Sequence, residues 1–276
     1  MIAWLDRRRA FRPAIPGLDD DHVSRALAAT AILMAGLFVV TSPAWVIDSR
    51  TIDAASVWTK PQKFNVSGFV HFMTLAWIAQ QLPRAVRAGP TLSIFAYLAV
   101  GSMLLENVYI SIQAARGRRS HFNFETDLEA SIYALMGVGA LLLVIVAIVL
   151  AVQILRKGDR ERPGLRLGSI IGLSVGAVAT IGFAGYMSTS GSHYVGGATD
   201  GGASVPFFGW SREIGDLRPA HFVALHMMQT LPIIGWLTDR VGGPSRLIVL
   251  SAGAAQLALA AFLFAQALDG RPFWPA

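Results

Sequence analysis

The stretch LLLVIVAIVLAV, residues 141–152, contains no polar or charged residue, and a predominantly apolar run surrounds it over residues 131–155. A helix that crosses a bilayer needs about 20 mostly apolar residues. We therefore predict a transmembrane helix over 131–155 and ask how much of the remaining chain has the same character.

The composition of the whole chain agrees with this first helix. Of its 276 residues, 54% are hydrophobic and only 14% are charged, whereas an ordinary soluble domain has about 25% charged residues. The mean hydropathy of +0.52 also favours a protein embedded in lipid. A soluble enzyme and a disordered protein are set aside, and the absence of Cys excludes disulfides, iron–sulfur clusters and cysteine nucleophiles.

Seven segments are long and apolar enough to be spans, which predicts an all-α, seven-transmembrane-helix bundle over residues 26–268. The second and sixth segments carry His, Gln and Pro, and polar residues within a span commonly mark function. The segments are 26–47, 64–83, 91–115, 131–155, 167–188, 219–238 and 246–268.

The distribution of basic residues predicts the orientation. Fourteen of the 23 Lys and Arg residues lie in the N-terminal segment 1–25 or near the connections after the second, fourth and sixth spans. By the positive-inside rule these parts are cytoplasmic. We expect a multi-pass protein of a bacterial inner membrane and no binding to nucleic acid, because the net charge of +6 is explained by topology.

Small residues recur at four-residue spacing in the fifth span, at Gly168, Gly172 and Gly176. Such a stripe allows two helix backbones to approach closely. We interpret it as a packing face. The Ala-rich seventh span is the candidate partner, and small-residue faces are also candidates for oligomer contacts.

Two spans place polar residues on one helical face, and a third span carries polar residues near its outer end. The sets are Ser67, His71, Thr74 and Gln81 in the second span, Ser102, Glu106, Tyr109 and Gln113 in the third, and His221, His226 and Gln229 in the sixth. At about 1.5 Å of rise per residue, His71, Glu106 and His226 each lie roughly 10 to 15 Å below the outer surface. An ionised carboxylate at that depth is costly unless it is paired or binds a cation.

These three residues form a His₂Glu set of the kind that holds zinc and leaves one position for water. The sequence therefore predicts a metal site at His71, Glu106 and His226, with Glu106 and Ser67 as catalytic residues. The substrate would be lipid-like or a small anion, in contact with the bilayer. The residues expected to bind it are Lys60, Lys63, Gln113, Arg116, His121, Asn123, Asp216, Arg218, His221 and Gln229.

The segment 189–218 is rich in Gly and aromatic residues and is long for a connection between helices. Loops of this length commonly cover a site. We expect an external lid over the polar residues.

The motif Ser67-x-x-x-His71 resembles that of the intramembrane zinc hydrolases of the ceramidase and adiponectin-receptor group, which implies a zinc-dependent hydrolase. The stretches WTKPQKF (58–64), SHFN (120–123) and DLRPAHF (216–222) together resemble a family of bacterial polytopic inner-membrane proteins. That second resemblance implies a membrane-embedded helical fold and supplies no reaction.

Three other functions use the same residues. Neutral His71 and His226 on two helices could be the axial ligands of a haem b in a redox protein. Glu106 and His71 could relay protons in a transporter or ligand-binding protein. An accessory membrane subunit would use the polar residues only to bind lipid.

Overall fold

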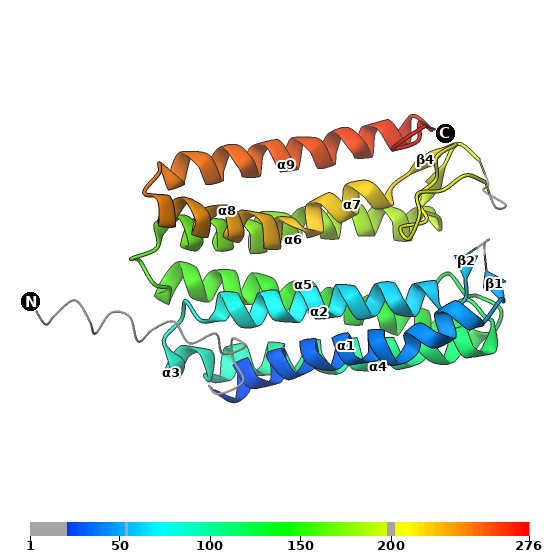
Figure 1. The fold of residues 1–276 in the computed structure, drawn as a ribbon, viewed down its shortest axis with the longest axis horizontal. Coiled ribbons are helices and arrows are strands. Elements are labelled where there is room, and N and C mark those ends of the chain that lie inside the picture. The colour runs from blue at the N-terminus through cyan, green and yellow to red at the C-terminus, as the bar shows by residue number, and fades with distance from the viewer. Residues whose placement is uncertain (1–20, 53–54, 198–201, 276) are drawn as a thin grey trace, which may run out of the picture.

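A computed structural model describes residues 21–52, 55–197 and 202–275, which form long helices and two short pairs of strands (Figure 1). The strands pair antiparallel, β1 with β2 and β3 with β4. The elements are α1 (His22–Ile47), β1 (Thr51–Ile52), β2 (Ala55–Ser56), α2 (Thr59–Ala79), α3 (Arg84–Arg87), α4 (Pro90–Arg116), α5 (Asp127–Lys157), α6 (Pro163–Ser190), β3 (Tyr194–Val195), β4 (Gly215–Asp216), α7 (Arg218–Leu225), α8 (Met227–Val241) and α9 (Ser245–Leu268).

The long helices run side by side and alternate in direction along the chain (Figure 1). Both strand pairs lie at one end of the bundle, which we call the strand end. The opposite end carries α3 and the connections 158–162 and 242–244, and we call it the α3 end. The predicted external loops all lie at the strand end.

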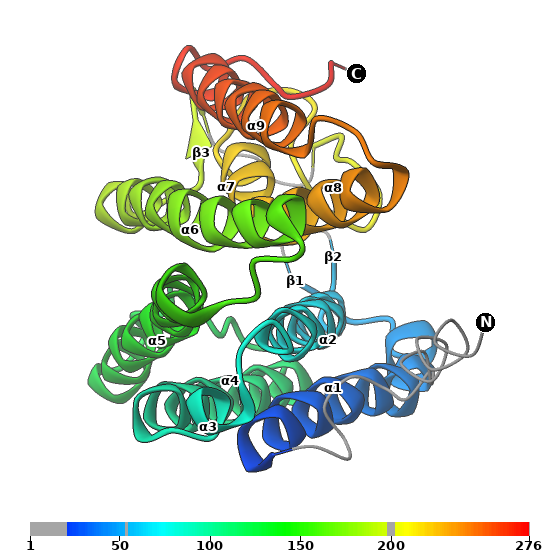
Figure 2. The same ribbon diagram turned by 90° about the vertical axis from the view of Figure 1, so that its left-hand side faces the viewer.

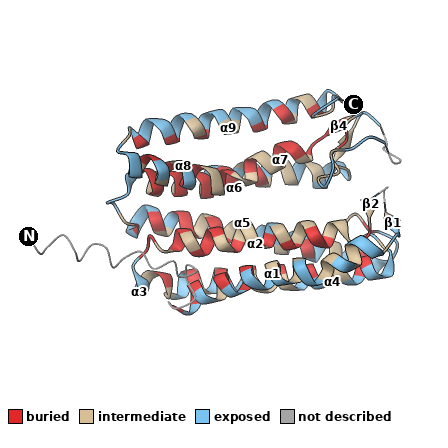
Figure 3. Ribbon diagram, in the orientation of Figure 1, coloured by how far each residue is buried: buried red, intermediate tan, exposed pale blue. Residues whose placement is uncertain are grey.

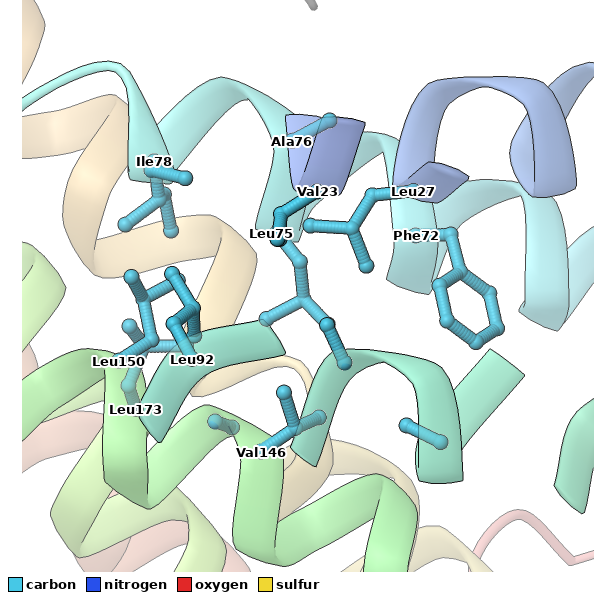
Figure 4. Packing of buried hydrophobic residues seen from close by; sticks show 14 of the residues in the cluster. Val23, Leu27, Phe72, Leu75, Ala76, Ile78, Leu92, Val146, Leu150 and Leu173 are labelled. Carbon is cyan, nitrogen blue, oxygen red and sulfur yellow. The ribbon is translucent and has the colours of Figure 1, made fainter. Parts of the chain in front are cut away.

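The helices form two groups (Figure 2). One contains α1, α2, α4 and α5, and the other contains α6, α7, α8 and α9, while contacts of α5 with α6 and of α2 with α8 join the groups. Leu27, Leu75 and Val146 converge in the core from α1, α2 and α5 (Figure 4). This buried cluster also includes Leu173 of α6 and Met228 of α8, so the core continues across the boundary.

The outer faces of the bundle are apolar and exposed (Figure 3). Leu105 is 74% exposed and Val40 is 73% exposed. Contiguous exposed apolar surface on this scale is unfavourable in water and is typical of contact with lipid. Among the described residues, five helices are long and apolar enough to cross a membrane, namely α1, α4, α5, α6 and α9. By helix length and hydropathy, the chain is a multi-pass membrane protein.

The predicted sixth span differs from a single helix. It divides into α7 and α8 at His226, where Gln229 N–H donates to the His226 carbonyl three residues earlier. The His226 ring also takes part in this interruption of the helix, because its Nδ1 lies 2.8 Å from the Phe222 carbonyl oxygen. This tightened turn interrupts the regular helix.

The predicted fourth span begins four residues earlier than expected, at Asp127. Thr126 caps this helix by accepting a hydrogen bond from the Glu129 N–H. A threonine followed three residues later by a glutamate is the sequence signature of such a start, and hydropathy alone does not detect it.

The glycine stripe of α6 packs on the α7–α8 segment. A Cβ atom at Gly168 would lie 2.2 Å from the Leu231 carbonyl oxygen, and one at Gly235 would lie 2.0 Å from the Gly164 carbonyl oxygen. The interpretation as a packing face is therefore confirmed. The expectation that α9 is the partner of this stripe was wrong, because α8 lies directly against these glycines.

At the α3 end, a buried ion pair joins the start of α1 to α3. Asp21 caps α1 by accepting hydrogen bonds from Val23 and Ser24, and its Oδ2 lies 3.0 Å from Arg87 Nε. Burial raises the pKa of the Asp21 carboxyl, but the hydrogen bonds from Ser24 and Arg87 outweigh it and hold the pKa below its ordinary value.

Because of this carboxylate, we expect the free energy of unfolding to decrease at acidic pH. A lowered carboxyl pKa contributes stability that is fully present above the unfolded-state pKa of about 3.9 and is lost as the pH falls through the folded-state value. The Asp21→Asn variant should lack this acid-dependent component while the wild type shows it. Unfolding of purified protein measured from about pH 6 down to pH 3 tests this, and identical pH profiles would contradict it.

Candidate functional site

At the strand end, Glu106 of α4 lies against His121 of the connection between α4 and α5. The Glu106 Oε1 and His121 Nε2 atoms are 3.3 Å apart, and the side chains are 6% and 21% exposed. The connection turns back over α4 because Gly117 takes a left-handed backbone with φ of 67°, which glycine adopts without strain. The other Glu106 oxygen, Oε2, is buried and has no hydrogen-bond partner among the described residues.

His121 is neutral near pH 7. Burial lowers the pKa of His121 well below its ordinary value, and the nearby charge of Lys60 lowers it further. A neutral imidazole has one N–H donor and one acceptor nitrogen. The His121 Nδ1 lies 3.2 Å from Ser120 Oγ, so Ser120, His121 and Glu106 form one row of polar groups.

A second cluster joins the two helix groups. Asp216 is buried, and it accepts hydrogen bonds from the Arg218 guanidinium and from the Ser211 N–H. The Lys63 ammonium of α2 donates to the Phe208 carbonyl oxygen at 2.8 Å. Lys63 is close enough to Arg218 and Asp216 for both charges to act on it. Only Arg218 contacts the carboxylate, and Lys63 lies within the electric field of this ion pair.

Aromatic side chains connect the two clusters. Phe64, the residue after Lys63, contacts His121 with ring centroids 5.7 Å apart. On the other side, Phe122 contacts His193, and Arg218 lies 5.1 Å from the centre of the Tyr194 ring. The clusters thus border one region of the strand end rather than two distant surfaces.

The described part of the 189–218 segment crosses both helix groups. Phe207 contacts Trp45 of α1, and Phe208 receives the hydrogen bond from Lys63 of α2. Gly209 has a φ of 66°, and a Cβ there would lie 3.6 Å from Lys63 Nζ. The glycine therefore brings the loop backbone close to the lysine. That the segment opens and closes as a lid stays a prediction.

Three other predicted residues hold the connection between α4 and α5 in place. Gln113 donates to the Arg119 carbonyl and to Glu129, and its Oε1 accepts from Arg116. Asn123 donates to the same Arg119 carbonyl. This geometry gives Gln113, Arg116 and Asn123 a role in fixing the turn that carries His121.

The predicted metal ligands are not gathered. The described residues include no group of three His, Cys, Asp or Glu side chains that could hold a metal ion. Glu106 faces His121 in place of His71 and His226, and Ser67 is exposed on α2. Helical depth placed the three residues at one level, but the rotation of each helix about its axis directs their side chains to different neighbours.

His71 lies deeper, at the boundary between the helix groups. With Thr180 of α6 and Met228 of α8 it lines a cavity of about 10 Å³, about the volume that accommodates one water molecule. His71 Nε2 and Thr180 Oγ1 are buried without hydrogen-bond partners among the described residues. His226 does not line this cavity, and haem binding by His71 and His226 stays a prediction.

The remaining predicted residues lie on the α7–α8 segment. His221 is half-buried on α7. Gln229 of α8 donates to Thr74 of α2 at 3.2 Å, which is a polar contact between the helix groups. Neither residue contacts Glu106 or Lys63 through a hydrogen bond in the described structure.

Sequence reasoning missed two buried polar positions. Glu129 accepts from Gln113 and Arg118, and the Thr126-x-x-Glu129 capping pattern could have indicated it. Asn107 donates to Asn65 of α2 at 3.0 Å. Asn107 follows Glu106 on α4 and lies outside the polar helical face predicted from Ser102, Glu106, Tyr109 and Gln113.

No protein-family model, curated protein or solved structure matches this chain. Its function is therefore inferred from its own residues.

Proposed function

We propose that the protein crosses a bacterial inner membrane seven times, with its N-terminus in the cytoplasm and the strand end outside. Besides the five apolar helices, α2 and the α7–α8 segment run the length of the bundle (Figure 1). Their polar residues face the boundary between the helix groups, as Thr74 and Gln229 do, and this explains their low hydropathy. The excess of basic residues in the N-terminal segment and in the connections after the second, fourth and sixth predicted spans supports the orientation.

We further propose that the strand end binds a small anionic group, such as a phosphate or a carboxylate. The observation that carries this proposal is the ratio of two cations, Lys63 and Arg218, to one buried carboxylate, Asp216. A buried charge without a counter-ion is costly. An anion from outside would supply the missing charge.

Lys63 is the residue most suited to contact the anion. An ammonium group has three N–H donors, and within the described structure only the Phe208 carbonyl oxygen accepts from it. Arg218 is already engaged by Asp216, the Gly209 carbonyl and Tyr194. We therefore assign direct binding to Lys63 and a supporting positive field to Arg218 and Lys60.

The Lys63→Met variant tests the anion site, because methionine keeps much of the apolar stem and removes the charge. The wild type should be stabilised by inorganic phosphate, by about 2.7 kcal/mol at a concentration 100 times Kd. The variant should lose this stabilisation. Without phosphate it should be as stable as the wild type or more stable, because its repulsion with Arg218 is gone. Thermal unfolding of the purified full chain in detergent measures both effects.

Lys157→Met is the matched control, since Lys157 lies in the last turn of α5 at the α3 end. It should respond to phosphate as the wild type does. Nanodiscs of zwitterionic phosphatidylcholine, with and without the anionic phosphatidylglycerol, distinguish an anionic lipid headgroup from free phosphate as the source of the anion. Equal responses of the wild type and Lys63→Met to both sources would refute the site.

A further inference from the structure

The proposed anion site leaves one feature of the strand end unexplained. Glu106 is 6% exposed, and its Oε2 has no hydrogen-bond partner among the described residues. A buried carboxylate oxygen without a donor is unfavourable unless it binds something. The smallest group that satisfies it is a proton.

His121 gives Glu106 a connection to the outer surface. Its side chain is 21% exposed, while its Nε2 lies 3.3 Å from Glu106 Oε1. When Glu106 is ionised, the favourable tautomer of neutral His121 has its proton on Nε2, facing the carboxylate, and Nδ1 accepts from the Ser120 hydroxyl. When Glu106 is protonated, the opposite tautomer is favourable, with Nδ1–H donating to Ser120 and Nε2 facing the carboxylic acid.

The two arrangements differ by the movement of protons along one row. A proton that arrives at His121 Nδ1 from the outer side is matched by the transfer of the Nε2 proton to Glu106. No covalent bond between heavy atoms changes, and the sole product is a protonated carboxyl group. This is the ordinary chemistry of a histidine proton shuttle.

The groups that face this row come from every neighbouring element. Lys60 of α2 is the cation whose charge acts on both Glu106 and His121. Tyr133 of α5 contacts the His121 ring. Next to Glu106 on α4, Asn107 donates to Asn65 of α2, which in turn donates to the neutral Thr41 of α1. Lys60 is thus the charge that connects the row to the anion site, one helical turn from Lys63.

We propose that Glu106 is a proton-binding site reached from outside through His121, and that anion binding at Lys63 favours its protonation. This inference rests on the proposed anion site. A negative charge that arrives near Lys60 and Lys63 opposes the field that stabilises the Glu106 carboxylate. For two unit charges at a separation of about 10 Å and an effective dielectric constant of about 20, an interaction of this kind changes proton affinity by more than tenfold. The protein would therefore take up an anion and a proton together.

Binding of sulfate at several pH values tests the coupling, because sulfate is a divalent oxyanion that does not itself titrate near neutral pH. The wild type should bind sulfate more than tenfold more tightly when Glu106 is protonated than when it is ionised, because the divalent ion interacts with the carboxylate more strongly than a unit charge does. Glu106→Gln imitates the protonated acid, so it should bind sulfate tightly at every pH at which Lys63 stays protonated, which is below the pKa of Lys63, lowered by burial to about 8. Calorimetry in buffers of different ionisation enthalpy should detect proton uptake with sulfate in the wild type and none in the variant.

Glu125→Gln is the control, because Glu125 is 60% exposed and pairs with Arg118 in the same connection. It should behave as the wild type. A Glu106→Gln variant that binds sulfate with the wild-type pH dependence and proton uptake would overturn the inference while leaving the anion site intact. Absence of sulfate binding in the wild type would refute the anion site itself.

If the wild type binds no sulfate, infrared difference spectra still test whether Glu106 binds a proton. Titration of the wild type without any anion should produce a protonated-carboxyl band that Glu106→Gln lacks and Glu125→Gln retains. If the wild-type and Glu106→Gln spectra are the same across the titration, Glu106 is not the proton-binding site.

Discussion

Replacing Gly172 with valine is expected to separate α6 from α8 and to lower the free energy of unfolding by about 3 kcal/mol or more. A Cβ atom at Gly172 would lie 2.3 Å from the Met227 carbonyl oxygen and 3.0 Å from its carbonyl carbon. Both atoms belong to backbone, which cannot rotate away as a side chain can. Helices in lipid associate through close van der Waals packing. Burial of the added methyl groups therefore does not replace the packing energy that is lost when the two helices move apart.

Gly182→Val is the matched control, because Gly182 lies on the same helix and a Cβ there meets nothing within 4 Å. Its stability should change by no more than about 0.5 kcal/mol. Unfolding of purified protein in mixed micelles with increasing sodium dodecyl sulfate, followed by tryptophan fluorescence, compares the two. Equal stability of the two variants would show that α6 and α8 do not approach as closely as described.

The second large effect is expected from Asp216→Asn, which should destabilise the protein by about 3 to 5 kcal/mol. Asp216 accepts from both the Nε and Nη2 of Arg218 and from the backbone N–H of Ser211. The neutral amide leaves the Arg218 cation partly buried without a counter-ion, next to the charge of Lys63. The strand end should therefore open before the helices separate.

Asp269→Asn removes a comparable ion pair in an exposed setting, since Asp269 and Arg271 are each 64% exposed. Exposed pairs contribute at most about 1 kcal/mol, so this control should be nearly neutral. The double variant Asp216→Asn with Arg218→Met should recover part of the loss, because it also removes the unpaired cation. A double variant no more stable than Asp216→Asn would show that the loss comes from the loop backbone rather than from the charge.

If Asp216→Asn also makes phosphate a stronger stabiliser than in the wild type, the anion is replacing the missing carboxylate. That outcome would tie the structural role of Asp216 to the proposed ligand. The same thermal unfolding assay with and without phosphate measures it.

The sequence predicted some features of the site well. Lys63, Asp216, Arg218 and His121 were expected on one side of the membrane, because each lies near the end of an apolar segment or in a connection, and the structure brings all four to the strand end. That this end is outside stays a prediction. The glycine stripe was also interpreted correctly, because close approach of backbones depends on residue size at fixed helical spacing.

The pairing of these residues could not be predicted in the same way. Glu106 was expected to meet His71 and His226, since all three lie at similar depth. Depth follows from the rise along each helix, but contact also requires the rotation of each helix and its neighbours in the bundle. The structure instead pairs Glu106 with His121, because Gly117 turns the chain back over the end of α4.

What the sequence by itself determined is that long apolar helices place this protein in lipid and that many of its polar residues lie toward one end of those helices. Those properties depend on the free energy of transferring each segment from water to lipid, and each segment contributes to that free energy independently of the others. Only the tertiary structure brings Lys63 close enough to Arg218, 155 positions further along the chain, for the two charges to interact. Such a contact is set by the packing of α6 against α8 and by the loop that crosses both helix groups, and neither can be read from a local pattern of residues.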